Sequence, residues 1–239
     1  TVRLEQNYRS TATILKAANA VIDNNRGRMG KELWTDSVDG DLISVYAAFN
    51  EQDEARFIVD RISAWVEAGG ARRDVALLYR SNAQSRALEE ALIQRGLPYV
   101  VYGGQKFYER LEIKNALAYL RLIWHRHDDP AFERVINTPA RGIGKATLEK
   151  LRTCANELGQ SLLVTAEQAP ALPALLAVAR KLAAFTSVIA QLRELLDLPV
   201  SELVSQVLLR SGLEQDLRAE RDAGGEDRLA NVQELVTAA

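Results

Sequence analysis

The sequence contains one cysteine, Cys154, among 239 residues, and only 6% of its residues are aromatic. A single cysteine excludes a disulfide within the sequence and argues against a cysteine-based metal site, so we expect no metal. No uninterrupted apolar run reaches the ~18–20 residues of a membrane-spanning helix, and no signal peptide is visible. We therefore expect a protein of the reducing cytoplasm with no membrane partner.

Net charge is also nearly absent, because 30 Lys and Arg offset 32 Asp and Glu. The distribution is uneven: residues 1–31 hold six basic and two acidic side chains, and residues 134–152 hold five basic and one acidic. Two basic stretches on a neutral chain fit a polyanionic partner such as nucleic acid. Basic surface stretches that bind no ligand are at least as common, so charge alone leaves the partner open.

Residues 1–107 alternate between strand and helix patterns, and Gly103-Gly104 marks the end of the alternation. Strands separated by helical segments of this length predict βαβ units and a parallel sheet. The continuous apolar run Val75–Tyr79 is typical of a strand covered on both faces. The expected strands are Val2–Leu4, Leu42–Ala48, Val75–Tyr79 and Tyr99–Tyr102, and the expected helices are Ser10–Asn24, Asp53–Ala68 and Ala83–Gln94.

Residues 108–239 carry helical patterns without strand signals, so we expect an α/β chain: a partial parallel-sheet domain followed by an all-α domain. The longest pattern places nine apolar side chains on one stripe. The sequence begins without Met and stops inside a helical pattern, so we expect an internal piece of a longer chain. The expected helices are Glu109–Arg126, Pro130–Asn137, Lys145–Leu158, Leu172–Leu196, Val200–Leu209 and Asp227–Thr237.

The first candidate site is the segment LEQNYRST, residues 4–11, where a strand pattern runs into a helix pattern. Such a junction offers free N–H groups and a partial positive charge to an anion, and Arg9 adds a full charge. An arginine there can stabilise charge on a transferring γ-phosphoryl group, and Tyr8 offers a flat face to a nucleobase. The alternative is a helix cap with an exposed Arg9 and a packed Tyr8.

The second candidate site is YRSNAQSR, residues 79–86, after the Val75–Tyr79 strand pattern. Open parallel sheets place ligands at this end of their strands. Arg80 offers a charged fork to phosphate, and Asn82 a short polar reach to sugar or base. The alternative is a helix cap at Ser81 or Asn82 with a solvated Arg86.

The third candidate site is GGQKFYER, residues 103–110, between the two halves of the sequence. Its two glycines allow a close backbone approach, and Lys106 can meet a phosphate. The alternative is a linker with a solvated lysine and packed aromatic side chains.

The fourth candidate site is NTPARGIGK, residues 137–145. A Gly-Ile-Gly turn that opens a helix resembles the hairpin of helix-hairpin-helix modules, whose backbone N–H groups bind phosphates without reading sequence. It is not a P-loop, because Pro139 and Ala146 stand where that motif needs Gly and Ser or Thr. A plain turn and cap is the alternative. The candidate DNA-binding residues are Thr138, Arg141, Gly142, Gly144 and Lys145.

These four segments, in this order, resemble motifs of the UvrD/PcrA/Rep-type superfamily 1 DNA helicases, most clearly over residues 1–144. The resemblance implies that Tyr8 stacks on adenine and that Arg9 reaches the γ-phosphate. It also implies that Arg80, Asn82 and Lys106 touch single-stranded DNA and that the Gly-Ile-Gly turn touches duplex DNA. The stretch GGQKFYERLEIKNALAYLR departs from the family pattern at Asn115, where Asp is usual.

By this resemblance, residues 1–107 are the first part of the second RecA-like motor domain, and residues 108–239 are part of its inserted helical accessory domain. The full-length parent would use ATP and Mg²⁺ to move 3′ to 5′ on single-stranded DNA and unwind duplex in repair or replication, with DNA-repair proteins as possible partners. This chain lacks the P-loop and the Mg²⁺-binding motif, so alone it should be inactive and bind no ATP tightly. A non-enzymatic DNA-binding module and a helicase–nuclease of the RecB or AddA type are the alternatives.

Overall fold

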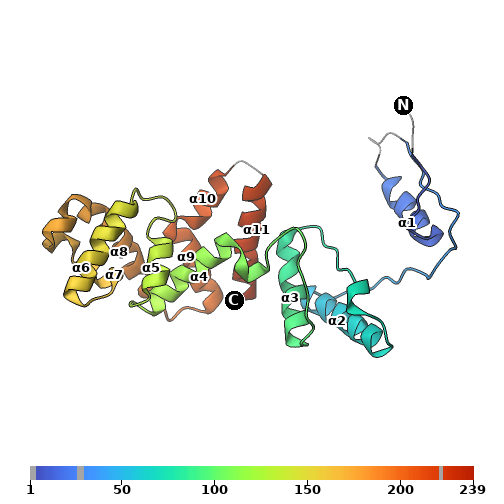
Figure 1. Cartoon of the computed structure of the whole chain (residues 1–239), viewed down its shortest axis with the longest axis horizontal. Helices are drawn as coiled ribbons and strands as arrows, with labels where there is room; N and C mark the ends of the chain where they lie inside the picture. Colours follow the sequence, from blue (N-terminus) through green and yellow to red (C-terminus); the bar gives the residue numbers. More distant parts are fainter. Residues whose placement is uncertain (1–3, 26–29, 221–222) are drawn as a thin grey trace. The chain divides into compact units, whose positions relative to one another are not determined.

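The computed structural model describes residues 4–25, 30–220 and 223–239, which form two compact units, residues 1–54 and residues 55–239 (Figure 1). The boundary that we predicted near residue 107 falls inside the second unit. Side chains of the 79–110 segment are hydrogen-bonded there to the last helix, as Arg86 is to Glu234 at 2.6 Å. These long-range bonds explain why the second unit includes both sides of residue 107.

The first unit is built around helix α1, Ala12–Ile22, which confirms the helix predicted at Ser10–Asn24 with shorter ends. Gln6 and Trp34 form an isolated parallel bridge beside it. The Asn19 side chain bonds to both backbone groups of Leu33, at 2.8 Å to its carbonyl oxygen and 3.2 Å to its nitrogen. Backbone pairing and side-chain bonds to backbone therefore connect the segment after α1 to the helix and to residue 6.

The predicted strands are not formed: the Gln6–Trp34 bridge is the only β-pairing in the part of the chain that the structure describes. Residues 2 and 3 of the predicted strand Val2–Leu4 lie outside that part. The other three predicted strands remain unpaired, and Leu78, expected to be covered on both faces, is 94% exposed. β-Branched composition favours an extended backbone, but a strand also needs a neighbouring chain to accept and donate its hydrogen bonds.

Helix α2, Glu51–Glu67, has its residues from Ala55 onward in the second unit, and α3, Ser85–Gln94, follows it; both match predicted helices. Val59 and Ile62 of α2 and Leu92 of α3 form a small buried cluster of their own. Three short 3₁₀ helices accompany this part: Arg72–Asp74, Asn82–Gln84 and Phe107–Glu109.

The remainder of the second unit is helical around one large core, as predicted (Figure 1). Helix α4, Leu111–Trp124, contacts both α9, Val200–Ser211, and α11, Ala223–Ala238. Phe185 lies at the core, with its ring centroid 5.5 Å from Phe132 and 6.5 Å from Tyr119. The helices are α4, Leu111–Trp124; α5, Asp129–Val135; α6, Lys145–Leu158; α7, Leu162–Glu167; α8, Ala179–Arg193; α9, Val200–Ser211; α10, Leu213–Ala219; and α11, Ala223–Ala238.

The long helix predicted at Leu172–Leu196 is divided into a 3₁₀ segment, Pro173–Val178, and α8, and a further 3₁₀ turn, Ala169–Ala171, precedes them. The stretch Pro173–Arg193 is long and apolar enough to cross a membrane by length and composition, a property that counting uninterrupted apolar runs overlooked. Leu182, Phe185 and Ile189 of this stretch are buried in the core. Core helices pass the same test, so it is weak support for a membrane span.

Candidate nucleotide- and DNA-binding sites

The Tyr8–Arg9 segment is a turn held by the Asn7 side chain. Asn7 Oδ1 accepts hydrogen bonds from the backbone N–H groups of Arg9, at 2.9 Å, and Ser10, at 2.8 Å. The Tyr8 side chain is 87% exposed, and its hydroxyl donates to Gln6 Oε1 at 2.8 Å. The ring is therefore open to a ligand, in contrast to the alternative in which Tyr8 is packed.

Four of the N–H groups that we predicted to be free at this junction are already bonded within the chain. Besides the two bonds to Asn7, the first N–H groups of α1 are occupied: Ala12 donates to the Val38 carbonyl at 3.3 Å and Thr13 to the Asp39 carbonyl at 3.2 Å. The side chain of Arg9 is exposed and forms no ion pair with another described residue. The exposed Arg9 guanidinium is therefore the main group that this turn offers to an anion.

The Arg80–Asn82 segment is held by Gln84, whose Oε1 accepts the backbone N–H groups of Arg80 at 2.9 Å and Ser81 at 3.0 Å. The Arg80 side chain is exposed. The Asn82 side-chain amide donates to Asp227 Oδ2 of α11 at 3.2 Å, a contact that the sequence did not suggest. A ligand of the Asn82 amide would have to displace this exposed carboxylate.

Lys106 is exposed, and its ammonium lies 4.8 Å from the centre of the Tyr99 ring. The next residue, Phe107, is buried and donates its N–H to Glu89 of α3 at 3.1 Å, and Glu89 also accepts the Tyr99 hydroxyl at 2.8 Å. Burial and this bond to Glu89 raise the pKa of Tyr99, so its hydroxyl remains a donor to higher pH than that of an ordinary tyrosine. Lys106 thus projects from a segment whose backbone is attached to α3.

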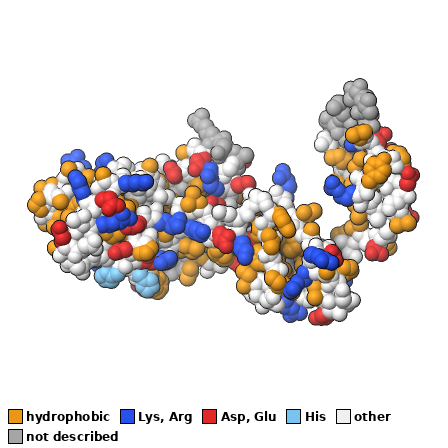
Figure 2. Space-filling model, viewed as in Figure 1, with side chains coloured by type: hydrophobic (Ala, Val, Ile, Leu, Met, Phe, Trp, Pro, Cys, Tyr) orange, Lys and Arg blue, Asp and Glu red, His pale blue; other side chains and the backbone are white. Residues whose placement is uncertain are grey.

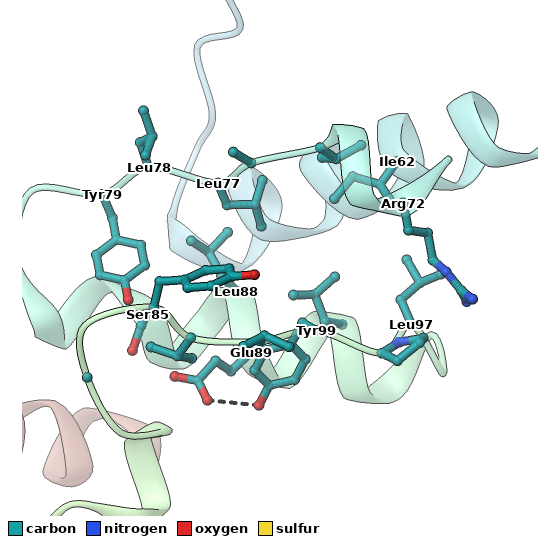
Figure 3. A pocket seen from close by; sticks show the side chains of 18 of the residues that line it. Ile62, Arg72, Leu77, Leu78, Tyr79, Ser85, Leu88, Glu89, Leu97 and Tyr99 are labelled. Carbon is teal, nitrogen blue, oxygen red and sulfur yellow. Dashed lines mark hydrogen bonds between the residues drawn. The ribbon is translucent and has the colours of Figure 1, made fainter. Parts of the chain in front are cut away.

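A groove of about 720 Å³ separates the extended segments at residues 75–79 and 97–104. Figure 3 shows the Tyr99–Glu89 hydrogen bond on one side of it and Leu77 on the other. The exposed apolar side chains Leu78, Val100 and Tyr102 belong to the two segments, and Figure 2 shows hydrophobic atoms at the surface of this part. The groove coincides with two of the predicted strands.

The Gly-Ile-Gly turn is organised by Asn137, whose Oδ1 accepts the N–H groups of Arg141 at 2.7 Å and Ile143 at 3.1 Å. Gly142 has φ +66°, which favours glycine, and a Cβ there would lie 2.8 Å from the ammonium of Lys181. Lys181, on α8, donates to the Gly142 carbonyl at 2.9 Å, so it adds a positive charge that local sequence did not reveal.

Gly144 and Lys145 form the start of α6. Gly144 is the N-cap, with φ −90°, and the position of a Cβ there is open space. Lys145 is exposed as the first residue of the helix. The Thr138 hydroxyl, by contrast, donates to the Arg134 carbonyl at 3.1 Å, a helix-end bond within the protein.

The guanidinium of Arg141 is hydrogen-bonded within the protein. Its Nη1 donates to the carbonyls of Val135 at 3.2 Å and Pro139 at 3.1 Å, and its Nη2 donates to the Tyr119 hydroxyl and the Ser211 carbonyl, both at 2.8 Å. The guanidinium also lies 5.3 Å from the centre of the Phe185 ring. The arrangement makes Arg141 a support of the turn rather than an open cation.

A family model described as the UvrD-like helicase C-terminal domain matches residues 2–171. The chain is 52% identical to DNA helicase II of Salmonella typhimurium and 50% identical to DNA helicase II of Haemophilus influenzae, in each case over 100% of the chain and 33% of the relative. It is 43% identical to the ATP-dependent DNA helicase PcrA of Leuconostoc citreum, over 99% of the chain and 32% of the relative.

The chain belongs to the UvrD-like helicase family, which confirms the family that the motifs predicted. It spans about a third of the length of these relatives. The enzymes named as relatives are DNA helicases, and those of the PcrA type are named as ATP-dependent.

Proposed function

We propose that the whole protein is an ATP-dependent DNA helicase that moves 3′ to 5′ on single-stranded DNA and opens duplex DNA. The observation that carries the proposal is the turn at residues 7–10, which presents an exposed Tyr8 and an exposed Arg9 on a backbone already satisfied by Asn7. Arg9 would stabilise charge that develops on the γ-phosphate, and Tyr8 would stack on the adenine. Mg²⁺ and the phosphate-binding loop would come from other parts of the protein.

In this proposal, the rest of the protein completes a parallel sheet. The groove between residues 75–79 and 97–104 leaves the apolar side chains of two extended segments exposed. A neighbouring strand would satisfy their backbone groups and bury Leu78, Val100 and Tyr102. Residues 1–107 would then belong to a RecA-like domain, with residues 108–239 as its accessory domain.

Two surfaces of residues 55–239 would bind different forms of DNA. The first consists of Arg80, Asn82 and Lys106 and would hold single-stranded DNA. The second consists of the Gly-Ile-Gly turn with Thr138 and Lys145 and would hold duplex DNA by its phosphates, with Arg141 supporting the turn from behind. Contacts of both kinds are to the backbone of DNA, so they would position the protein without reading sequence.

Gly144→Asp is expected to weaken binding to a duplex with a 3′ tail and to spare binding to oligo-dT. The new carboxylate would repel phosphates at the start of α6, while the open space around Gly144 and the preference for Asp at an N-cap protect the fold. Lys106→Ala is expected to do the opposite and weaken oligo-dT binding. Each lost phosphate contact should lower the salt slope by roughly 0.7–0.9, measured by fluorescence anisotropy at several salt concentrations.

Gly144→Ala is the matched control, because it adds the same Cβ without the charge and should bind both substrates nearly as the parent does. If folded Gly144→Asp loses both substrates equally, or neither, the duplex role of the turn is wrong and it is a plain helix cap.

The isolated 239-residue chain is expected neither to hydrolyse ATP nor to bind it tightly, because its sequence contains no G-x-x-x-x-G-K-[ST] loop. The measurement is phosphate release by the purified chain with and without oligo-dT, beside the full-length protein. DNA-stimulated hydrolysis by the chain alone, abolished by Arg9→Ala, would contradict this division of the nucleotide site. A full-length protein without ATPase activity would favour a non-enzymatic DNA-binding module.

A further inference from the structure

Arg110 is a buried arginine between the 3₁₀ turn Phe107–Glu109 and helix α4, with 8% of its surface exposed. Its guanidinium stands 5.3 Å from the centre of the Phe107 ring. No carboxylate lies within ion-pair distance of it among residues 55–220 and 223–239. Its charge is instead stabilised by hydrogen bonds to uncharged acceptors. A buried charge is tolerated only where such hydrogen bonds or an ion pair are made.

The four acceptors of Arg110 come from three parts of the chain: residues 82–85, Gln105 and Asn231. Nη1 donates to the backbone carbonyl of Asn82 at 2.9 Å and to Asn231 Oδ1 at 2.8 Å. Nη2 donates to Ser85 Oγ at 2.7 Å, and Nε reaches the Gln105 carbonyl at 3.4 Å. Asn231 in turn donates to Glu112 at 2.7 Å, which fixes the orientation of its amide.

Two of these acceptors belong to the segments that carry the proposed single-strand contacts. Asn82 is itself one of those contacts, and Gln105 directly precedes Lys106. The two segments are more than 20 residues apart in the sequence, and the planar fork of one guanidinium holds a backbone carbonyl of each. A lysine would supply the positive charge but not the planar group with several N–H donors that binds both carbonyls.

We propose that Arg110 is a positioning residue for single-stranded DNA, which sets the spacing between Asn82 and Lys106 so that both meet one strand. The proposal rests on the single-strand role of these two residues. Arg110 itself is buried and touches no DNA. Through Asn231, Arg110 also connects the Asn82 and Lys106 segments to helix α11. The same helix carries Asp227, which accepts a hydrogen bond from the Asn82 amide.

Arg86 is a matched control within the same part of the fold. It is 3% exposed and also connects α3 to α11, by a 2.6 Å bond to Glu234, and it forms a second bond of 2.7 Å to Glu90 within α3. None of these bonds reaches the Asn82 or Gln105 backbone. Replacing either arginine by lysine should therefore lower stability, but only the Arg110 change should disturb the spacing of the DNA contacts.

The test compares Arg110→Lys and Arg86→Lys in the full-length protein by oligo-dT anisotropy titrations at several salt concentrations, with thermal unfolding followed by circular dichroism. Arg110→Lys is expected to weaken oligo-dT binding roughly tenfold, as for the loss of a charge-assisted contact, and to lower the salt slope by ~0.7. Arg86→Lys should lower the melting temperature without changing either binding quantity. Tailed-duplex contacts at the Gly-Ile-Gly turn should be unaffected by both.

A second comparison separates positioning from general weakening. In a protein that already carries Asn82→Ala and Lys106→Ala, Arg110→Lys should cause little further loss of oligo-dT binding, because the contacts it positions are gone. If the losses add, or if Arg110→Lys binds oligo-dT as Arg86→Lys does, the positioning role is overturned. If Asn82→Ala and Lys106→Ala alone leave oligo-dT binding unchanged, it is the proposed single-strand surface that fails.

Should Arg110→Lys not fold, Ser85→Ala provides the milder test. It removes one acceptor of the guanidinium and leaves the arginine, the two carbonyls and Asn231 in place. The same loss in the same direction is expected, reduced to roughly two- to threefold. Unchanged oligo-dT binding in folded Ser85→Ala, with wild-type salt slope, would contradict the proposal.

Discussion

Arg9→Ala in the full-length protein is expected to lower kcat for DNA-stimulated ATP hydrolysis by about 10³-fold or more while leaving ATP binding largely intact. The guanidinium would meet charge that grows only as the γ-phosphoryl group is transferred, so its loss raises the barrier more than it weakens the ground state. The fold should not suffer, because the turn is held by Asn7 through backbone bonds and the Arg9 side chain is exposed. Steady-state kinetics and equilibrium binding of a fluorescent ATP analogue measure the two effects separately.

Tyr8→Ala is the companion variant, and it should act mainly on KM for ATP, since stacking on the base is present before and during the reaction. Its hydroxyl bond to Gln6 is solvent-exposed, so little stability is lost with it. A near-normal kcat for Arg9→Ala would remove Arg9 from the catalytic site. An equal effect of both variants on KM alone would make the turn a binding element only.

The helices were predictable because the information that defines them is local. Helix α6 was predicted with the bounds that it has, Lys145–Leu158, since Gly144 and Gly159 mark its two ends and its apolar residues follow one face. The two short helices α7 and α10 were missed, whereas α5, which is equally short, was predicted because Pro130 marks its start. The break at Val178 was missed because the apolar stripe continues through it.

Strand pairing and the roles of individual charged side chains depend on residues far away in the sequence. Local sequence patterns did not predict these two features. The segment at residues 75–79 has the composition of a strand, but its own sequence does not indicate whether a neighbouring strand is present to pair with it. Likewise, Arg80 and Arg141 are both basic residues in candidate motifs. The side chain of the first is exposed, while that of the second is bonded to a carbonyl 70 residues away, at Ser211. Motif resemblance therefore located the candidate surfaces, and the structure distinguishes exposed side chains from supporting ones.

Arg141→Ala is expected to lower the free energy of unfolding of the helical part by about 3 kcal/mol or more, because several partly buried acceptors would lose their donor at once. These acceptors include the Tyr119 hydroxyl and the carbonyls of Pro139 and Ser211. Tyr119 would lose a donor in the core, where burial already raises its pKa to about 12. Urea unfolding followed by circular dichroism measures the loss.

Lys145→Ala is the matched comparison, because it removes a basic residue from the same motif at an exposed position that forms no ion pair with another described residue. It should change stability by no more than about 0.5 kcal/mol and should weaken tailed-duplex binding with a lower salt slope. Arg141→Ala, measured at a temperature where it remains folded, should keep that salt slope, since no phosphate contact is removed. A stable Arg141→Ala with a reduced slope would show instead that this guanidinium leaves its carbonyls and binds DNA directly.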